Sequence, residues 1–443
     1  AVAVLADAPV PGVPTLVAPD PRRALAAVAA ELQGHPAREL RLVGITGTLG
    51  KTSTSLLLES ALAAAGTSVG AIGSLGVRRG PPRSAAAAHT ARMTTPDPPA
   101  IHAALRRLAD ARVHTVVIEI TSHGILQERV AGLELAAGLF TNLVPDEHLE
   151  YHPTAEHYVR TKLRFLDLLP PDAPLVVEAS NHRVLAHAGA RPGARAPVTL
   201  ALDGALGAAV RLAGVRHHVN GASFVLEIAR DLAGARGVSV SAGEVPLDLL
   251  LLGRHQLANA AMAAVAALLL GAPADAVARA FAAPPPLRRR MEVVWGGRPL
   301  VLDDTVGNPR SLRAVFDSVR PIAGTGVRVV FGIRGSRGAA INGRLAATLA
   351  ESVGGLVANT PVRLIVTACE DAAGAPNRVH DDEREAVLAA LRAAGTVHTY
   401  EPTLAGAIDR VLDGCRASEL VLLLGAQGMD RAAELARARL EAR

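Results

Sequence analysis

A glycine-rich loop that ends in Lys51 and Thr52 is the clearest chemical signal in the 443-residue chain. The loop, Gly44-Ile-Thr-Gly-Thr-Leu-Gly-Lys-Thr52, lies between an apolar run and a helical pattern. There, backbone N–H groups and a helix N-terminus can surround a phosphate, with Lys51 on the β- and γ-phosphates and the Thr52 hydroxyl on Mg²⁺. The common phosphate loop has glycine where this chain has Ile45. We predict a nucleotide site, the alternative being a turn that contains Gly-Lys-Thr by chance.

Carboxylates and histidines follow two other apolar runs. Glu119 lies at the end of a predicted strand, Thr115–Ile120, where a carboxylate can reach a nucleotide-bound Mg²⁺. The segment 141–152 follows another predicted strand and holds two histidines and three carboxylates, which suit a cation and an anionic substrate. A solvent-facing Glu119 and structural histidines are the alternatives. A third position, Lys162, lies in a helical pattern, where a lone lysine is ordinarily a solvated surface residue.

Composition limits the class of protein. Half of the residues are hydrophobic, only 2% are aromatic, and the net charge of +5 comes from scattered arginines, which disfavours a nucleic-acid partner. Cys369 and Cys415 lie far apart without metal-ligand spacing, which predicts reduced thiols in the cytoplasm. The most apolar run, Ala258–Ala272, is short and closed by Gly-Ala-Pro, so we expect a buried helix and no membrane span. The N-terminus has no signal-peptide pattern and no initiator Met, as in a processed chain or one cut from a longer protein.

Strand and helix patterns alternate along most of the chain. This alternation predicts an α/β protein with a mostly parallel, doubly wound sheet, and places binding residues at the carboxyl ends of its strands. The expected strands are Leu40–Val43, Ser68–Ile72, Thr115–Ile120, Ala136–Thr141 and Ala173–Glu178; the expected helices are Ser53–Ala65, Pro99–Ala111, Thr154–Leu168, Asn181–His187, Gln256–Leu270 and Pro273–Ala282. Short alternating pieces between about 197 and 252 predict an antiparallel β insert.

Two boundaries divide the predicted architecture. Residues 1–25 hold too few elements for a domain of their own. The Pro284–Pro286 and Arg288–Arg290 runs indicate a linker, after which strand–helix alternation resumes. We therefore predict a central domain over 26–287 and a smaller, Rossmann-like α/β domain over 288–443, the latter of ordinary domain size.

An ordered set of motifs resembles the Mur ligases. They are Gly44–Thr52, Thr94-Thr-Pro-Asp97, Glu119-Ile-Thr-Ser-His123, Gln127–Gly132, Thr141-Asn-Leu143, His148-Leu-Glu-Tyr-His152, Lys162, Gly253–Asn259 and Arg290-Met-Glu292. The likeness extends over about residues 15–440 and is greatest to the MurE-type ligases, which add an amino acid to UDP-N-acetylmuramoyl-dipeptide in peptidoglycan precursor synthesis. On this resemblance, residues 1–25 are a remnant of a largely absent N-terminal UDP-binding domain.

The resemblance implies a cytoplasmic, monomeric ligase that uses ATP and Mg²⁺. The acceptor carboxylate takes the γ-phosphoryl group to give an acyl phosphate, and the incoming amino acid displaces phosphate in a cleft that closes between two domains. It implies catalytic roles for Lys51, His148 and a carbamoylated Lys162. The other implied sets are nucleotide contacts at Gly47, Thr48, Gly50, Lys51, Thr52, Ser53, Asn259, Arg290 and Asp304; Mg²⁺ ligands at Thr52, Glu119, His148 and carbamoylated Lys162; and UDP-muramoyl-peptide contacts at Thr94, Thr95, Ser122, Gln127 and Arg129.

The chain departs from the family pattern mainly in its C-terminal part. Leu49 replaces the usual Asn of the loop, and Asp304-Thr-Val-Gly-Asn-Pro309 lacks the family's His. Thr367-Ala-Cys-Glu-Asp371 stands in place of the Asp-Asn-Pro-Arg motif of diaminopimelate users, and Ala426–Asp430 in place of Lys-Gly-His-Glu. Two alternatives follow: a ligase for another γ-carboxyl acceptor, like folylpolyglutamate or cyanophycin synthetases, and a degenerate nucleotide-binding paralogue. Glu370 and Asp371 hint at a cationic amino acid, although acids in a loop are usually just solvated.

Overall fold

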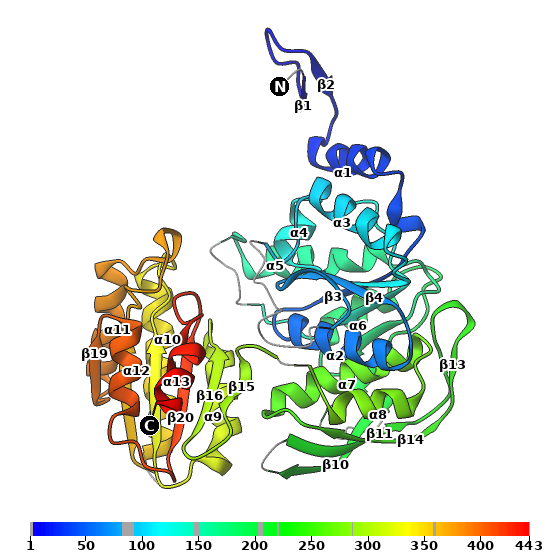
Figure 1. Ribbon diagram of the computed structural model, residues 1–443. Helices are drawn as coiled ribbons and strands as arrows, with labels where there is room; N and C mark the ends of the chain where they lie inside the picture. The colour runs from blue at the N-terminus through cyan, green and yellow to red at the C-terminus, as the bar shows by residue number, and fades with distance from the viewer. Residues whose placement is uncertain are drawn as a thin grey trace. The chain divides into compact units, whose positions relative to one another are not determined.

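The chain folds into two compact units, each with its own sheet. The computed structural model describes residues 3–81, 93–145, 151–202, 207–218, 221–285, 287–357 and 360–442. The first unit comprises Ala1–Leu250 and His255–Pro286, and the second Leu251–Arg254 and Leu287–Arg443 (Figure 1). The predicted α/β class is confirmed.

The first unit is built on a ten-stranded sheet. Its order is β14-β11-β10-β9-β8-β7-β3-β6-β4-β5, and the central strands from β9 to β4 are parallel, as predicted. The strands are β3 (Arg41–Thr46), β4 (Val69–Gly73), β5 (Gly76–Arg79), β6 (Thr115–Glu119), β7 (Ala137–Phe140), β8 (Leu175–Glu178), β9 (Val198–Ala201), β10 (Val210–His218), β11 (Gly221–Ile228) and β14 (Gly243–Leu249). Two small pairs stand apart, β1 (Val4–Ala6) with β2 (Thr15–Val17) and β12 (Leu232–Ala233) with β13 (Ser239–Val240).

Three of the described helices of this unit, α1, α4 and α5, begin at a residue whose side chain accepts a hydrogen bond from the first turn. Asp20 accepts a hydrogen bond from the Arg23 N–H ahead of Pro21, so α1 starts at a side-chain cap. The helices are α1 (Pro21–Leu32), α2 (Lys51–Ala64), α3 (Pro98–Asp110), α4 (Ser122–Leu126), α5 (Ala155–Leu163), α6 (His182–Gly189), α7 (Arg254–Leu269) and α8 (Ala274–Ala282). The single helix predicted over 154–168 ends at Leu163 and continues as a 3₁₀ turn, a frequent way for a helix to end.

The antiparallel strands of the first unit extend the main sheet. β10 pairs parallel to β9, β11 pairs antiparallel to β10, and β14 pairs antiparallel to β11. The predicted antiparallel β insert over residues 197–252 is therefore confirmed. Hydrogen bonding continues unbroken from β8 through β9 to β10, so the insert extends the main sheet.

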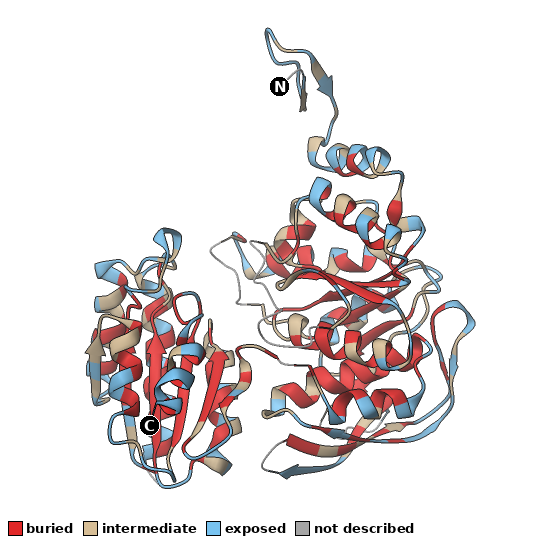
Figure 2. Ribbon diagram, in the orientation of Figure 1, coloured by how far each residue is buried: buried red, intermediate tan, exposed pale blue. Residues whose placement is uncertain are grey.

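The second unit is a six-stranded sheet covered on both faces. Its order is β15-β16-β20-β17-β18-β19, with only β15 antiparallel to its neighbour. The elements are β15 (Arg290–Trp295), β16 (Leu300–Thr305), α9 (Pro309–Val319), β17 (Val327–Gly332), α10 (Ala339–Val357), β18 (Val362–Thr367), α11 (Asp381–Ala393), β19 (His398–Glu401), α12 (Leu404–Leu412), β20 (Leu420–Gly425) and α13 (Ala432–Glu441). Helices α9, α10 and α11 supply one hydrophobic core, and α12 and α13 supply the other, so the strands between them are buried (Figure 2).

Strand β15 was missed because its pattern is irregular. Arg290 begins this strand, whereas the sequence suggests a linker through Arg288–Arg290. The register against β16 shifts twice, between Arg290 and Glu292 and between Val293 and Trp295. Such irregularities break the alternation of apolar and polar residues by which a strand is recognised.

Four adjacent parallel strands place the chemistry of the first unit at one edge. β7, β3, β6 and β4 are neighbours in that order. Their carboxyl ends therefore lie side by side, and they lead into Thr141, Gly47, Ile120 and Ser74 respectively. Within the ranges that the structure describes, no helix has the length and apolar character needed to cross a membrane.

Candidate functional site

Two glycines give the loop after β3 its shape. Gly47 has φ 139°, and a Cβ there would lie 1.9 Å from the Thr141 hydroxyl oxygen. Gly50 has φ 86° and is the N-cap of α2; its Cβ would lie 2.2 Å from Asn259 Oδ1. Both positions therefore exclude side chains, for steric and for conformational reasons. The loop presents its main chain at the start of a helix, as the sequence predicts.

Residues after β7 hold the main chain of the loop. The Leu49 N–H donates to Asn142 Oδ1 at 2.9 Å, and the Leu49 carbonyl accepts from the Thr141 hydroxyl at 2.6 Å and from Asn142 Nδ2 at 3.0 Å. Thr48 Oγ1 lies 2.8 Å from the hydroxyl of the buried Tyr158. Because these contacts to Leu49 use only its main chain, they do not require the Asn that the family usually has there.

The only two lysines among the 46 basic residues of the chain meet at one carbonyl. Lys51 Nζ donates to the Gly47 carbonyl at 2.8 Å and to the Thr48 carbonyl at 3.1 Å. Lys162 Nζ donates to the same Gly47 carbonyl at 2.6 Å and to Thr46 Oγ1 at 3.3 Å. Lys162 is 1% exposed; its burial lowers its pKa well below the ordinary value, and the charge of Lys51 lowers that pKa further. Lys162 is therefore a buried lysine whose charged form is disfavoured, not a solvated surface lysine.

Glu119 lies beside the start of α2. Its Oε2 accepts a hydrogen bond from the Thr52 hydroxyl at 2.8 Å, and the whole side chain is buried. Ser74, the residue directly after β4, donates to both carboxylate oxygens: its N–H to Oε1 at 3.0 Å and its hydroxyl to Oε2 at 3.1 Å. The solvent-facing alternative for Glu119 is excluded. Oxygen ligands on Thr52 and Glu119 suit Mg²⁺, which takes few protein ligands beside phosphates and waters.

The residues predicted to bind the acceptor form a second network at the same edge. Arg129 Nη1 donates to the Thr95 carbonyl at 2.6 Å and Nε to Gln127 Oε1 at 3.0 Å, while Gln127 Nε2 donates to the Tyr151 hydroxyl at 2.6 Å. The Thr95 hydroxyl donates to the Glu119 carbonyl at 3.0 Å. Two further pairs complete the set, Thr94 Oγ1 with Ser74 Oγ at 3.0 Å and Ser122 Oγ with His152 Nε2 at 3.0 Å. All five predicted positions thus lie near one another and near Glu119.

Three predicted positions need separate mention. Asn259 is nearly buried, its Oδ1 lies 3.4 Å from Thr54 Oγ1, and its side chain faces Gly50, so it packs against the loop. Ser53 is buried in the first turn of α2. His148 lies outside the described residues, as do the three carboxylates of the same segment, so that prediction stays open.

Arg290 and Asp304 lie in the second unit and pair across β15 and β16. Asp304 Oδ2 accepts a hydrogen bond from the Met291 N–H at 2.7 Å, and Arg290 Nη1 donates to the Arg289 carbonyl at 2.8 Å. Arg289 itself, at φ 54°, is buried and donates to Asp430 Oδ1 at 2.5 Å and to the Gly425 carbonyl at 2.6 Å. Arg290 thus lies beside a buried arginine, Arg289, although the sequence suggests a linker at both positions.

Asp303 is a buried carboxyl with an incomplete set of partners. One oxygen lies 3.4 Å from Arg289 Nε, whereas Oδ2 has no hydrogen-bond partner among the described residues. Burial raises the pKa of Asp303 to about 7, and the Arg289 charge offsets this only in part. Asp303 therefore binds a proton in the folded protein at a pH where the unfolded chain has lost it.

We expect the Asp303→Asn substitution to change the pH dependence of stability. The pKa of Asp303 is about 7 in the folded protein, against an ordinary value of 3.8. The stability that this raised pKa contributes to the wild type is therefore complete below pH 3.8 and is lost as pH rises through 7. The unfolding temperature of the variant, relative to that of the wild type, should therefore rise between pH 5 and pH 8. Thermal unfolding across this pH range checks it; a constant difference would contradict the raised pKa.

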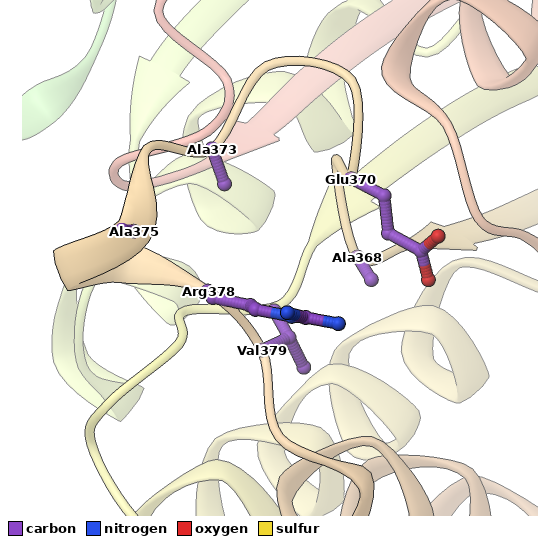
Figure 3. Close-up of a pocket in the computed structure, with 6 residues that line it drawn as sticks. All are labelled: Ala368, Glu370, Ala373, Ala375, Arg378 and Val379. Atoms are coloured by element: carbon purple, nitrogen blue, oxygen red, sulfur yellow. The ribbon is translucent and has the colours of Figure 1, made fainter.

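A pocket of about 390 Å³ lies at the carboxyl end of β18 (Figure 3). Its lining residues are Ala368, Glu370, Ala373, Ala375, Arg378 and Val379. The neighbouring Asp371 accepts hydrogen bonds from the Leu404 and Ala405 N–H groups at 2.6 and 3.1 Å, so it caps the start of α12. Of the two acids that hint at a cationic amino acid, Asp371 has this structural role and Glu370 lines the pocket.

Two residues of the site, Ser74 and Tyr158, are not singled out from the sequence, although both make hydrogen bonds to predicted positions. His152, one of the two histidines of the 141–152 segment, lies 3.0 Å through Nε2 from Ser122 Oγ. Ser74 carried no sequence signal, because it comes two residues after the predicted strand Ser68–Ile72, and only the structure extends that strand to Gly73 as β4. For Tyr158 the signal was its spacing, since it precedes Lys162 by one helical turn in α5.

Comparison with known families gives matches over both units. The "Mur ligase middle domain" model matches residues 45–267, and the "Mur ligase, glutamate ligase domain" model matches residues 289–427. A UDP-N-acetylmuramoyl-L-alanyl-D-glutamate–2,6-diaminopimelate ligase of Mesorhizobium japonicum is 37% identical over 355 residues, covering 77% of this chain and 67% of that protein. A UDP-N-acetylmuramyl-tripeptide synthetase of Roseiflexus sp. is 32% identical over 425 residues, covering 93% and 79%.

Solved structures with the same fold are more distant in sequence. A structure of a UDP-N-acetylmuramoyl-L-alanyl-D-glutamate–2,6-diaminopimelate ligase aligns with a TM-score of 0.64 at 20% identity, covering 99% of this chain and 87% of that one. A folylpolyglutamate synthase of Mycobacterium tuberculosis, complexed with ADP and AMPPCP, aligns with a TM-score of 0.70 at 18% identity, covering 95% of each chain. At these identities the likeness establishes the fold alone.

Proposed function

Because this chain belongs to the Mur ligase family, we propose that it adds an amino acid to the carboxylate of a UDP-N-acetylmuramoyl-dipeptide with hydrolysis of ATP to ADP. Members of the family are ATP-dependent, ADP-forming amide ligases. The observation that carries the proposal is the convergence of Lys51, Lys162, Thr52 and Glu119 at the strand edge that also holds the five predicted acceptor contacts. We further propose that the protein acts as a monomer and that it works in the cytoplasm, where Cys369 and Cys415 would stay reduced.

The chemistry asked of these residues is positioning and charge neutralisation. An oxygen of the acceptor carboxylate attacks the γ-phosphorus, the bond to the ADP oxygen breaks, and an acyl phosphate forms. The amine of the incoming amino acid then attacks the acyl carbon, phosphate leaves and the nitrogen loses a proton. The loop N–H groups and Lys51 would bind the phosphates and neutralise charge that grows as the phosphoryl group moves. Thr95, Gln127 and Arg129 would orient the acceptor.

The divalent cation would be Mg²⁺, held by Thr52 and Glu119, with His148 as a further candidate. When bound, it would supply charge neutralisation between the phosphates and the acceptor carboxylate. Lys162 would join this set after reaction of its neutral amine with carbon dioxide, which gives a carbamate in place of an ammonium group. The lowered pKa of Lys162 supports this role, because only the neutral amine carries the lone pair that forms the new bond.

The pocket after β18 is our candidate site for the incoming amino acid. An α-amino acid carries a cationic amino group, which could pair with Glu370, and an anionic carboxylate, which could pair with Arg378. We expect Glu370→Gln and Arg378→Gln to raise KM for the amino acid by about tenfold each, the cost of one lost charged hydrogen bond. The KM for ATP should stay unchanged, and Glu385→Gln on α11 is a matched surface control. Equal effects on both substrates would exclude this assignment.

Two alternatives remain distinct from this proposal. A ligase for a different γ-carboxyl acceptor would share the fold of the folylpolyglutamate synthases, but that likeness concerns the fold only. A degenerate paralogue would retain nucleotide binding without turnover. The sequence relatives at 32–37% identity act on UDP-N-acetylmuramoyl substrates by their names, which favours the main proposal.

The experiment that tests the proposal measures ADP release. Purified protein is incubated with ATP, Mg²⁺, UDP-N-acetylmuramoyl-dipeptide and a panel of amino acids that includes diaminopimelate, lysine and ornithine. We expect ADP to form only when acceptor and one class of amino acid are both present. Absence of ADP with every amino acid would refute the proposal, and ADP formation with a folate or poly-amino-acid acceptor instead would favour the first alternative.

A further inference from the structure

Ser74 occupies a junction between the predicted cation site and the predicted acceptor site. It follows β4 directly, at the turn that joins β4 to β5. Its N–H and hydroxyl both donate to Glu119, and its oxygen lies 3.0 Å from Thr94 Oγ1. A serine hydroxyl has one proton, so when that proton goes to Glu119 the Thr94 hydroxyl must donate to Ser74. The resulting chain runs from Thr94 through Ser74 to the carboxylate.

This arrangement gives the two carboxylate oxygens of Glu119 different hydrogen-bond donors. Oε1 accepts from the Ser74 N–H, a donor fixed by the backbone. Oε2 accepts from two hydroxyls, those of Thr52 and Ser74, and the Thr52 proton can rotate away because Thr52 is itself a predicted cation ligand. Oε2 is thus the oxygen that can exchange the Thr52 proton for a cation while it keeps the hydrogen bond from Ser74. The close approach of the turn depends on Gly73, where a Cβ would lie 2.2 Å from Oε1.

A buried ion pair holds the turn in place. Arg78 on β5 donates from Nη2 to Glu59 Oε1 at 2.6 Å, and the Ser55 hydroxyl donates to the same oxygen at 2.8 Å. The side chains of Arg78 and Glu59 are 7% and 0% exposed. Because Glu59 lies on α2, the helix that begins with Lys51 and Thr52, this pair ties the β4–β5 hairpin to the phosphate-binding helix. Because the pair is removed from water, separation of the two side chains would leave a buried charge uncompensated. The contact therefore suits a role in positioning the hairpin against α2.

We propose that Ser74 is a positioning residue that orients the Glu119 carboxylate for the cation and couples it to the acceptor through Thr94. The inference rests on the proposed function and extends it to a residue outside the motifs discussed above. In this orientation the Thr94 hydroxyl already donates its hydrogen bond to Ser74. Its oxygen can therefore only accept a hydrogen bond from the bound substrate, for example from an amide N–H of the muramoyl peptide. The β4–β5 hairpin, which Arg78 and Glu59 anchor, supports this series of hydrogen bonds from Thr94 to Glu119.

The test compares Ser74→Ala with Ser74→Thr. Alanine keeps the N–H donor to Oε1 and removes the hydroxyl, whereas threonine keeps both. In Ser74→Ala we expect the dissociation constant of Mg²⁺ for the protein–ADP complex, measured by calorimetry without turnover, to rise about tenfold, which is the effect of one lost charged hydrogen bond. We expect kcat to fall and KM for the acceptor to rise, while the dissociation constant of ADP measured without Mg²⁺ stays unchanged. Ser74→Thr should restore the Mg²⁺ dissociation constant to within about threefold of wild type.

The controls separate this inference from misfolding and from the proposed function. Ser318→Ala, on α9 of the second unit, removes a hydroxyl that donates to the Ala314 carbonyl and should change none of these values. Thermal unfolding of Ser74→Ala within a few degrees of wild type excludes misfolding. An unchanged Mg²⁺ dissociation constant in Ser74→Ala, or no recovery in Ser74→Thr, would overturn the inference. Should the wild type release no ADP with any UDP-muramoyl acceptor, the proposed function fails while the Mg²⁺ titration still decides the role of Ser74.

Discussion

A Lys162→Met variant is expected to lose ADP formation by on the order of 10³-fold, comparable to removal of one preorganised charged group from an active site. Methionine matches the length of the aliphatic stem and keeps the helix, but it has no amine at the Gly47 carbonyl. Arg160→Met, an exposed basic residue two positions earlier in α5, is the matched control and should leave ADP formation unchanged. Lys162→Arg should fail as well, because a guanidinium stays charged and cannot form a carbamate.

The Lys162→Met variant should be no less stable than the wild type. Burial of the Lys162 amine opposes its charge, and methionine removes that cost. Since the folded pKa of Lys162 is lowered from 10.5, the unfolded chain binds a proton that the folded chain lacks, between the lowered value and 10.5. Wild-type stability should rise with pH in this window relative to Lys162→Met. A variant that unfolds at much lower temperature would indicate a packing role instead.

The carbamate itself can be tested on the wild type. Enzyme depleted of carbon dioxide should lose activity and regain it with bicarbonate, and ¹³C-bicarbonate should give a carbamate signal in the NMR spectrum of wild type only. Activity that does not respond to bicarbonate would mean that Lys162 acts as an amine.

For Lys51→Ala we expect a loss of similar size, on the order of 10³-fold in kcat, because the charge that would neutralise the β- and γ-phosphates is removed. The acceptor should bind as before, which isothermal titration in the absence of ATP would measure. Lys51→Arg, which keeps the charge with a different head group, should retain part of the activity. ADP formation within about tenfold of wild type in Lys51→Ala would contradict the assignment of the loop.

The two lysine substitutions should not be additive. The Lys51 charge is one cause of the lowered Lys162 pKa, so Lys51→Ala should raise that pKa and make carbamoylation less favourable. The double variant Lys51→Ala/Lys162→Met should therefore lose little more activity than either single variant, as residues that act as a unit do. Losses that multiply would argue that the lysines act in separate steps.

The sequence was sufficient to predict the parallel core of the first unit and the edge at which its site lies. The apolar runs placed Gly47, Glu119 and Thr141 at the carboxyl ends of strands. In the structure Gly47 lies against Thr141, and Glu119 accepts a hydrogen bond from Thr52 of the same loop. The prediction depends only on periodicity and on the rule for parallel sheets. It failed for β15, where two register shifts break the period.

Roles that depend on long-range contacts could not be predicted. Ser74 is one serine among many until the fold brings β4 beside β6. Arg289 adopts a positive φ that favours glycine, and its buried contacts to Gly425, Asp430 and Asp303 explain how that conformation is held. Asp371 could be read as a substrate-binding acid only until its contacts with the start of α12 were known. In each case the deciding partner lies far away in the sequence.

A chain with two lysines is an unusual object for spectroscopy and chemical labelling. Both side-chain amines touch the Gly47 carbonyl, so every lysine signal in the molecule reports on a single spot. Biosynthetic incorporation of ¹⁵N- or ¹³C-lysine would give a two-peak spectrum without assignment by mutagenesis of a crowded background. Because Lys162 is 1% exposed and Lys51 is only partly buried, amine-selective reagents should react first at Lys51, so nucleotide protection of Lys51 can be followed by intact mass.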